Sequence, residues 1–126
     1  MAPIRVLVVD DHPDSADSLA RWLAVAGFDT LAARDGEEAL LSAARWHPKV
    51  GIIDLGLRKL DGFEVAKRLR KEPWAIELLL IAYTGWATLE DRQHAYRAGF
   101  DYYVTKPAEP EEFLRMICFG TATFSS

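Results

Sequence analysis

Short apolar runs that end in a charged side chain recur along this chain. Three of them lead into acidic or basic groups: Val6–Val9 into Asp10 and Asp11, Gly51–Ile53 into Asp54, and Tyr103–Thr105 into Lys106. Each run has the length and apolar character of a buried β-strand. Ligands of an open parallel sheet bind outside the carboxyl ends of its strands, so we expect these charged groups to meet in one crevice.

Three carboxylates in one crevice have an electrostatic consequence. They repel one another and raise their own pKa values unless a cation joins them. A hard divalent cation with oxygen ligands meets that requirement. One aspartate is then available as a nucleophile, and Lys106 is available to hold incoming negative charge.

Helical patterns separate the apolar runs. We expect strands at Val6–Val9, Phe28–Ala33, Val50–Ile53, Leu78–Ala82 and Tyr102–Val104. We expect helices to begin near Pro13, at the capping signals Asp35–Glu38, Asp61–Glu64 and Thr88–Asp91, and at Glu111, the last one ending near Phe119. Inward stripes are predicted to include Ala16, Leu19, Leu23 and Ala26 in the first helix, and Leu40, Ala43 and Ala44 in the second. Strands alternating with helices predict an α/β fold with a doubly wound parallel sheet.

Length and composition narrow the class of protein. The 126 residues are enough for one domain, expected at residues 1–119, with a frayed tail at 120–126. The net charge of −4 argues against a nucleic-acid-binding surface, and a single cysteine excludes an internal disulfide. No apolar segment reaches the roughly 20 residues of a membrane span, and the start lacks a signal-peptide pattern. We therefore expect a cytoplasmic protein with no membrane partner.

Taken one at a time, the candidate residues have ordinary explanations. An acidic doublet such as Asp10-Asp11 is usually solvated, and Asp54 or Thr84 can simply bond to a turn. Lys106 can be a surface lysine, although it precedes a proline, and a cis bond there would fix its direction. Their agreement at four strand ends favours a functional site.

The chain resembles the receiver domains of bacterial two-component response regulators, of the chemotaxis-receiver type. The matching residues are Asp10-Asp11, Asp54, Asp61-Gly62, Thr84-Gly85, Tyr103 and Lys106-Pro107. They lie in the family's order and spacing from about Ile4 to Phe119. The resemblance implies a flavodoxin-like (βα)5 fold with strand order 2-1-3-4-5.

The resemblance also implies a chemistry for these residues. Asp54 would be the phosphoacceptor, taking a phosphoryl group from a phosphohistidine on a sensor histidine kinase or a histidine phosphotransfer domain. Mg²⁺ would be held by Asp10, Asp11, Asp54 and the backbone carbonyl of Gly56. Lys106 and Thr84 would neutralise charge on the phosphoryl oxygens. Such a domain is a switch with at most weak self-dephosphorylation, not a conventional enzyme.

A switch needs an element with two states. By resemblance, Thr84 would move toward the phosphoryl group while Tyr103 rotates inward behind it. The face formed by the fourth helix, fifth strand and fifth helix would then present a changed surface to a downstream protein, and a homodimer is a separate expectation. An alternative reading of Tyr103 is a half-buried aromatic that never moves.

Three features of the sequence stand beside the motifs shared with the receiver family, and the first is a departure from the family's usual sequence. Family members commonly have proline four residues after the phosphoacceptor, whereas this chain has Arg58, followed by Lys59. We hypothesise that these cations alter partner docking or phosphoryl lifetime; a solvated charged loop is the alternative. Trp86, two residues after Thr84, could shield a phosphoryl group from water; a surface aromatic or a docking contact is the equal alternative. The segments 14–19 and 82–86 resemble receivers of hybrid sensor histidine kinases.

Two other functions stay open at this point. A Mg²⁺-dependent phosphohydrolase acting through an aspartyl phosphate also uses aspartates at strand ends. In such enzymes, however, the first strand is followed by an Asp-x-Asp motif. A phosphate-independent interaction module would keep the fold without the signalling chemistry. Degenerate receivers usually lack an acidic residue or the lysine, and this chain retains them all.

Overall fold

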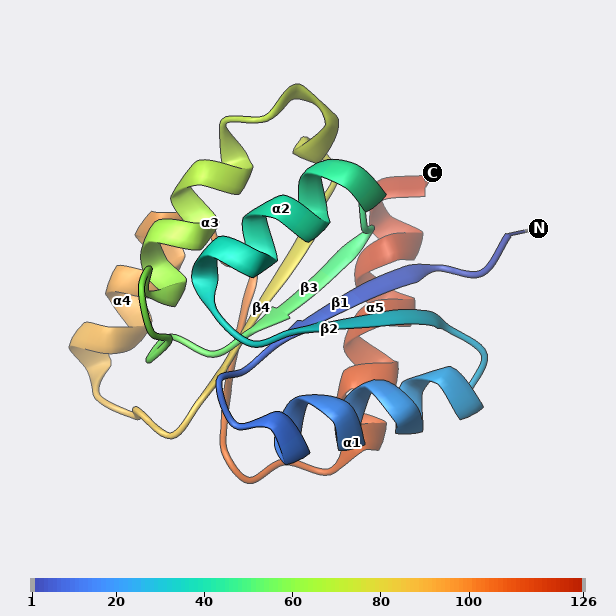
Figure 1. Ribbon diagram of the computed structural model, residues 1–126, viewed down its shortest axis with the longest axis horizontal. Helices are drawn as coiled ribbons and strands as arrows, with labels where there is room; N and C mark the ends of the chain where they lie inside the picture. Colours follow the sequence, from blue (N-terminus) through green and yellow to red (C-terminus); the bar gives the residue numbers. More distant parts are fainter. Residues whose placement is uncertain (1, 126) are drawn as a thin grey trace.

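A five-stranded parallel sheet forms the centre of the molecule (Figure 1). The computed structural model describes residues 2–125, with side chains described as far as residue 120. The strands are β1 (Arg5–Val9), β2 (Asp29–Ala33), β3 (Val50–Ile53), β4 (Leu79–Thr84) and β5 (Tyr102–Thr105). Their order across the sheet is β2-β1-β3-β4-β5, and every neighbouring pair is parallel. The expected doubly wound fold and strand order are confirmed.

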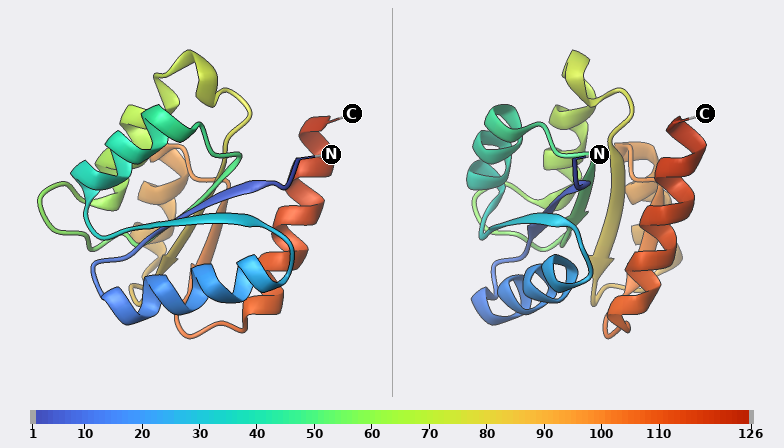
Figure 2. Two further views of the ribbon diagram at one scale, coloured as in Figure 1. Left: turned by 45° about the vertical axis from the view of Figure 1, so that its right-hand side comes forward. Right: turned by 90° about the vertical axis from the view of Figure 1, so that its right-hand side faces the viewer.

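Helices cover both faces of the sheet. They are α1 (Pro13–Val25), α2 (Gly36–Trp46), α3 (Gly62–Arg70), α4 (Leu89–Ala98) and α5 (Pro110–Ser125), with a short 3₁₀ turn, η1, at Pro73–Ala75. α1 and α5 lie on one face, and α2, α3 and α4 lie on the other (Figures 1 and 2). Among residues 2–125, none of these helices has both the length and the apolar character that a bilayer crossing requires.

The strands are apolar throughout because both of their faces are buried. In β1, Leu7 and Val9 belong to the core under α2, α3 and α4, whereas Val6 and Val8 belong to the core under α1 and α5. Successive side chains of a strand point to opposite faces, so one run of valine and leucine serves two cores. The strand ends are thereby held in register at one edge of the sheet.

Three predicted helix starts are confirmed by their caps. The side chains at Asp35, Asp61 and Thr88 accept the backbone N–H of the residue three positions on, at 2.8, 2.9 and 3.1 Å respectively. Such caps satisfy N–H groups that the first helical turn leaves without partners. Because α3 and α4 follow strands β3 and β4, these caps also fix the loops at the carboxyl edge.

Several predicted boundaries and helix faces were wrong. Ala26 and Ala44 are exposed, because Ala26 already lies at the C-cap of α1, and Ala39 with Ala43 forms the inward face of α2. β2 begins one residue after Phe28, and β4 runs to Thr84, two residues beyond its expected end.

The last helix is also longer than predicted. α5 continues to Ser125, although the sequence placed its end near Phe119. Gly120, the first residue after that expected end, packs against β4. A Cβ atom there would lie 2.8 Å from the side chain of Leu79. The glycine thus permits close packing within the helix, and the side chains of 121–126 lie outside the described residues.

Candidate functional site at the carboxyl edge of the sheet

Lys106 joins two of the predicted carboxylates. Its Nζ atom lies 2.7 Å from Oδ2 of Asp10 and 3.0 Å from Oδ2 of Asp54. Asp10 follows β1, Asp54 follows β3, and Lys106 follows β5, so three separate strand ends supply the group. Both carboxylates are buried, with 4% and 8% of their surface exposed. The convergence predicted from the strand ends is confirmed for these three residues.

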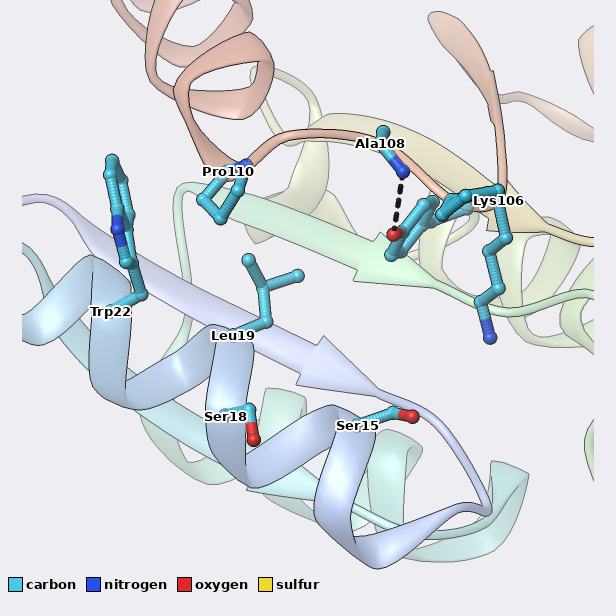
Figure 3. A pocket seen from close by; sticks show the side chains of 9 residues that line it. Ser15, Ser18, Leu19, Trp22, Lys106, Ala108 and Pro110 are labelled. Atoms are coloured by element: carbon cyan, nitrogen blue, oxygen red, sulfur yellow. Dashed lines mark hydrogen bonds between the residues drawn. The ribbon is translucent and has the colours of Figure 1, made fainter.

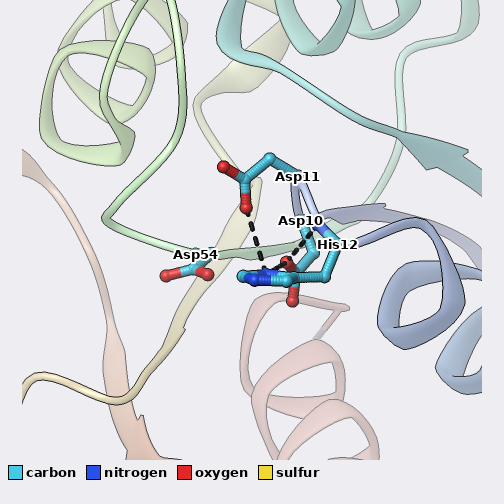
Figure 4. Close-up of side chains that lie close together, drawn as sticks. All are labelled: Asp10, Asp11, His12 and Asp54. Carbon is cyan, nitrogen blue, oxygen red and sulfur yellow. Dashed lines mark hydrogen bonds and ion pairs between the residues drawn. The ribbon is translucent and has the colours of Figure 1, made fainter.

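Asp11 completes the acidic group with an unexpected neighbour, His12. The Nδ1 atom of His12 lies 3.1 Å from Oδ1 of Asp10 and 3.2 Å from Oδ1 of Asp11 (Figure 4). One potential ligand atom from each of Asp10, Asp11, His12 and Asp54 lies within 4.8 Å of the others. His12 was missed from the sequence, where a histidine before a proline reads as an ordinary loop residue.

Burial and pairing act in opposite directions on the charges of this site. Burial alone would raise the pKa of Asp10, but hydrogen bonds from the Lys106 ammonium and the His12 backbone, with the Lys106 charge, lower it. Burial likewise disfavours charged Lys106, yet its hydrogen bonds to Asp10 and Asp54 and their charges raise its pKa. The ion pair therefore keeps both groups charged at neutral pH.

The chain after β3 approaches the site closely. The Gly56 backbone N–H donates to Oδ1 of Asp54 at 3.2 Å. A Cβ atom at Gly62 would lie 2.3 Å from the Asp54 carbonyl oxygen, so only glycine fits there at the start of α3. The Asp54 carboxylate is thus held from two sides, by Gly56 on its own loop and by Lys106 across the sheet.

Thr84 and Lys106 are linked at neighbouring strand ends. The backbone N–H of Lys106 donates to the Thr84 carbonyl at 2.9 Å, and the Lys106–Pro107 bond is cis. The Thr84 hydroxyl oxygen accepts the N–H of Trp86 at 3.3 Å, and the side chain is 1% exposed. Thr84 therefore lies at the predicted edge, with its hydroxyl oriented by the loop that follows β4.

Trp86 and Tyr103 form a second layer beside the site. Trp86 lies against Gly56, where a Cβ atom would be 3.2 Å from the indole ring. The buried Tyr103 donates its hydroxyl hydrogen to the carbonyl of Trp86, and the Arg92 guanidinium lies 4.8 Å from the Tyr103 ring centre. Tyr103 is thus in an inward position in this structure.

Arg58, at the place of the usual proline, and Lys59 after it have different partners. Nε of Arg58 lies 3.5 Å from Oδ2 of Asp11, while Nζ of Lys59 lies 3.6 Å from Oδ2 of Asp35. Lys59 has a positive φ of 66°, in a tight turn where the Leu60 N–H donates to the Arg58 carbonyl. Arg58 therefore touches the acidic group, whereas Lys59 is directed toward α2.

A shallow cavity of about 460 Å³ adjoins Lys106 between α1 and the loop after β5 (Figure 3). Its lining is mainly apolar and includes Leu19, Trp22 and Pro110, with Ser15 and Ser18 on the α1 side. Tyr83 also lines it, and its hydroxyl accepts the N–H of Ala108 at 3.2 Å. The cavity is thus a recess beside the charged group.

The chemistry open to this arrangement follows from its donor set. Clustered carboxylate oxygens suit a hard divalent cation, and the nearby lysine suits a small anion such as a phosphoryl group. Asp10 and Asp54 each have a backbone N–H on Oδ1 and the Lys106 ammonium on Oδ2. This fits a nucleophilic carboxylate whose products are stabilised by fixed positive charge.

Comparison with known proteins identifies matches over almost the whole chain. The response regulator receiver domain family matches residues 6–118. An uncharacterised 14.6 kDa protein of Leptolyngbya boryana is 40% identical over 117 residues, which is 93% of this chain and 89% of that protein. Curated transcriptional regulators with 33–38% identity also match, and this chain spans only 43–47% of their length.

Solved structures agree with that match. The chemotaxis protein CheY4 of Vibrio cholerae is 28% identical with a TM-score of 0.88, covering 94% of this chain and 98% of that one. A response regulator protein of Burkholderia pseudomallei, solved with a phosphorylated aspartic acid, a calcium ion and citrate, is 29% identical with a TM-score of 0.82. That match covers 88% of this chain and 64% of the other.

Proposed function

The chain belongs to the response regulator receiver domain family, and we propose that Asp54 is the residue on which it accepts a phosphoryl group. A receiver domain is a phosphoacceptor switch of two-component signalling, not a conventional enzyme. The observation that supports Asp54 is its contact with Lys106, which holds it beside Asp10 at the carboxyl edge of the sheet. The Burkholderia relative was solved with a phosphorylated aspartic acid, which supports an aspartic acid as the phosphoacceptor.

In the transfer, a carboxylate oxygen of Asp54 forms a bond to phosphorus as the phosphorus–nitrogen bond of a phosphohistidine breaks. The electron pair of that bond stays on the departing imidazole. Lys106 already contacts Asp54 and can follow the charge from the carboxylate to a phosphoryl oxygen. The Gly56 N–H, now bonded to Oδ1 of Asp54, orients the nucleophile.

The metal proposed for the site is Mg²⁺. The cluster of Asp10, Asp11 and Asp54 fits it, because their oxygens gather at one point and magnesium prefers a few carboxylates with water. When bound, the ion would neutralise charge on the phosphoryl oxygens. The Gly56 carbonyl remains the predicted fourth protein ligand.

The proposed switch links Asp54 to the α4-β5-α5 face. The Thr84 hydroxyl would leave the Trp86 N–H and donate to the phosphoryl group, shifting the loop after β4. That loop is also bonded to Tyr103, whose hydroxyl donates to the Trp86 carbonyl. Phosphorylation would thus change how Trp86 and the start of α4 present themselves to a downstream protein.

The proposed partners follow from the chemistry and the surface. A sensor histidine kinase or a histidine phosphotransfer domain would supply the phosphoryl group in the cytoplasm, approaching along the recess beside Lys106. The transcriptional regulators among the relatives are about twice as long as this chain, so about half of each regulator lies outside the matched segment. A hybrid-kinase parent and a homodimer both stay predictions.

The test is intact mass after incubation with acetyl phosphate and Mg²⁺, comparing the native chain with Asp54→Ala. We expect a single phosphoryl adduct that requires both Mg²⁺ and Asp54. Beryllofluoride binding, followed by changes in NMR spectra, is the second measurement because some receivers use small donors poorly. Loss of both responses would reject the phosphoacceptor role and favour the phosphate-independent interaction module.

A further inference from the structure

The direction of the His12 side chain is not explained by its role at the start of α1. It is the N-cap residue of α1, where a serine, threonine or aspartate side chain usually accepts a helical N–H. Here the His12 carbonyl accepts the N–H groups of Ser15 and Ala16, at 3.1 and 3.2 Å. Pro13, the next residue, has no N–H to satisfy. The imidazole is therefore not needed to start the helix, and it points to the carboxylates instead (Figure 4).

The spacing around the imidazole matches that of ligands around a single ion. Nδ1 lies 3.1 Å from Oδ1 of Asp10 and 3.2 Å from Oδ1 of Asp11. Neighbouring ligands of an octahedral ion with bonds of about 2.1 Å are about 3.0 Å apart. The His12 backbone N–H also donates to Oδ1 of Asp10 at 3.0 Å, which ties the loop to that carboxylate.

The surrounding charges leave this corner of the site open to a cation. Lys106 contacts the other oxygen of Asp10, and Arg58 contacts the other oxygen of Asp11. The Oδ1 atoms of both aspartates therefore face His12 (Figure 4). Three carboxylates against two permanent cations leave a net negative site when the histidine is neutral, which favours a divalent ion.

We propose that His12, through Nδ1, is a ligand of the divalent ion at this site and makes the site prefer first-row transition ions to Mg²⁺. Mg²⁺ takes oxygen ligands and keeps its waters, whereas imidazole nitrogen strengthens binding of ions such as Co²⁺ and Ni²⁺. The inference rests on the proposed function, since it concerns the metal of the same site. It assigns ion selectivity to a residue outside the three aspartates.

The test combines a direct view of nitrogen ligation with two affinities. Pulsed electron paramagnetic resonance of Mn²⁺ bound to the full chain reports nitrogen coupling from a coordinated imidazole. Calorimetry then gives the affinities for Co²⁺ and Mg²⁺. The variants are His12→Gln and, as a matched control, His47→Asn, which removes a remote histidine and tolerates its positive φ of 52°.

We expect nitrogen coupling in the native chain and in His47→Asn, and its loss in His12→Gln. His12→Gln should weaken Co²⁺ binding by about tenfold and Mg²⁺ binding by less than about twofold. Absent coupling in the native chain, or coupling that survives His12→Gln, would overturn the proposal, as would equal losses for both ions. Phosphorylation of Asp54 with Mg²⁺, measured separately by mass, distinguishes failure of the proposed function from failure of this inference.

Discussion

Lys106 divides its ammonium group between Asp10 and Asp54, and this one contact accounts for much of the electrostatics of the site. A buried carboxylate without a partner is costly, and two such groups side by side repel each other. The lysine thus stabilises the fold before any ligand binds. In the proposed function the same ammonium would meet phosphoryl charge, so one residue would serve both stability and the proposed chemistry.

We predict that Lys106→Met lowers the free energy of unfolding by about 2 kcal/mol at pH 7 in EDTA, since two charged hydrogen bonds are lost. The folded-state pKa of Asp10 lies below 3.8, so its stabilisation is present above that pH and fades as the pH falls through the lowered value. The pKa of Lys106 lies above 10.5, so its stabilisation is present below that pH and fades as the pH rises through the raised value.

Urea unfolding of the native chain and Lys106→Met from pH 3 to pH 11 checks this prediction. The difference between the two proteins should be greatest between about pH 4 and pH 10 and should shrink at both ends. A difference that stays constant across the whole range would show that packing, not the ion pair, is responsible.

Arg58 is the cation that meets the acidic group from the solvent side. We predict that Arg58→Pro raises Mg²⁺ affinity two- to threefold and changes the half-life of phosphorylated Asp54, because it removes a charge 3.5 Å from Asp11. The effect is modest because exposed ion pairs contribute about 0–1 kcal/mol. The measurements are Mg²⁺ titration at low and high salt and the decay of the phosphoryl adduct.

Two further variants separate the causes in that experiment. Arg58→Gln removes the charge without the proline ring, and Lys59→Gly removes the neighbouring cation while suiting its positive φ. We expect Arg58→Gln to behave like Arg58→Pro and Lys59→Gly to behave like the native chain. If Arg58→Pro changed neither the Mg²⁺ affinity, nor the decay of phosphorylated Asp54, nor the rate of phosphoryl transfer from a partner, the loop would simply be solvated.

Single residues differed in how well the sequence revealed them. Asp10, Asp54 and Lys106 could be predicted to meet because a parallel sheet brings its strand ends to one edge. The position of His12 could not, since it depends on the loop after β1, where no periodic pattern constrains a side chain. Arg58 was suspected from its position, but its contact with Asp11 rather than Asp35 is set by the turn at Lys59.

Among the helices, the first residues were predicted better than the last residues. Asp35, Asp61 and Thr88 were identified as caps because their side chains satisfy specific N–H groups, a local effect that sequence encodes. The end of α5 depends on tertiary packing. Gly120 fits against Leu79, and the helix continues past a residue that normally ends one.

The cap of α3 tests the link between a helix start and the site. We predict that Asp61→Ala lowers the free energy of unfolding by about 1 kcal/mol, because Oδ1 of Asp61 then no longer accepts the Glu64 N–H. Asp61→Asn keeps an accepting oxygen and should stay within a few tenths of a kcal/mol of the native chain. Urea unfolding measures both, and equal losses would show that the charge matters instead of the hydrogen bond.

At the scale of the whole molecule, the layer of α2, α3 and α4 and the layer of α1 and α5 make different contacts with the strands that lead to the site. The core under α2, α3 and α4 contains Tyr103, whereas the core under α1 and α5 contains Val104 from the same strand. The loop after β4 joins the site to the first layer through Trp86, which touches Gly56 and accepts from Tyr103. In the proposed switch, these contacts would connect Asp54 with the start of α4.

We predict that beryllofluoride slows amide hydrogen exchange at residues 86–92 several-fold in the native chain, and that Tyr103→Phe removes at least half of this protection. The substitution deletes the hydroxyl that bonds to the Trp86 carbonyl but leaves the residues around Asp54 in place. Tyr102→Phe is the matched control, since that ring packs toward α1 and α5 on the opposite face. It should respond like the native chain.

Beryllofluoride affinity measured on the same samples decides the interpretation. Equal affinity with reduced protection in Tyr103→Phe would identify the hydroxyl as the coupling between site and α4. Full protection in that variant would contradict the prediction and place Tyr103 among aromatic residues that only fill the core. Loss of affinity would mean that the tyrosine supports the site itself, because its bond to the loop after β4 would then position Thr84.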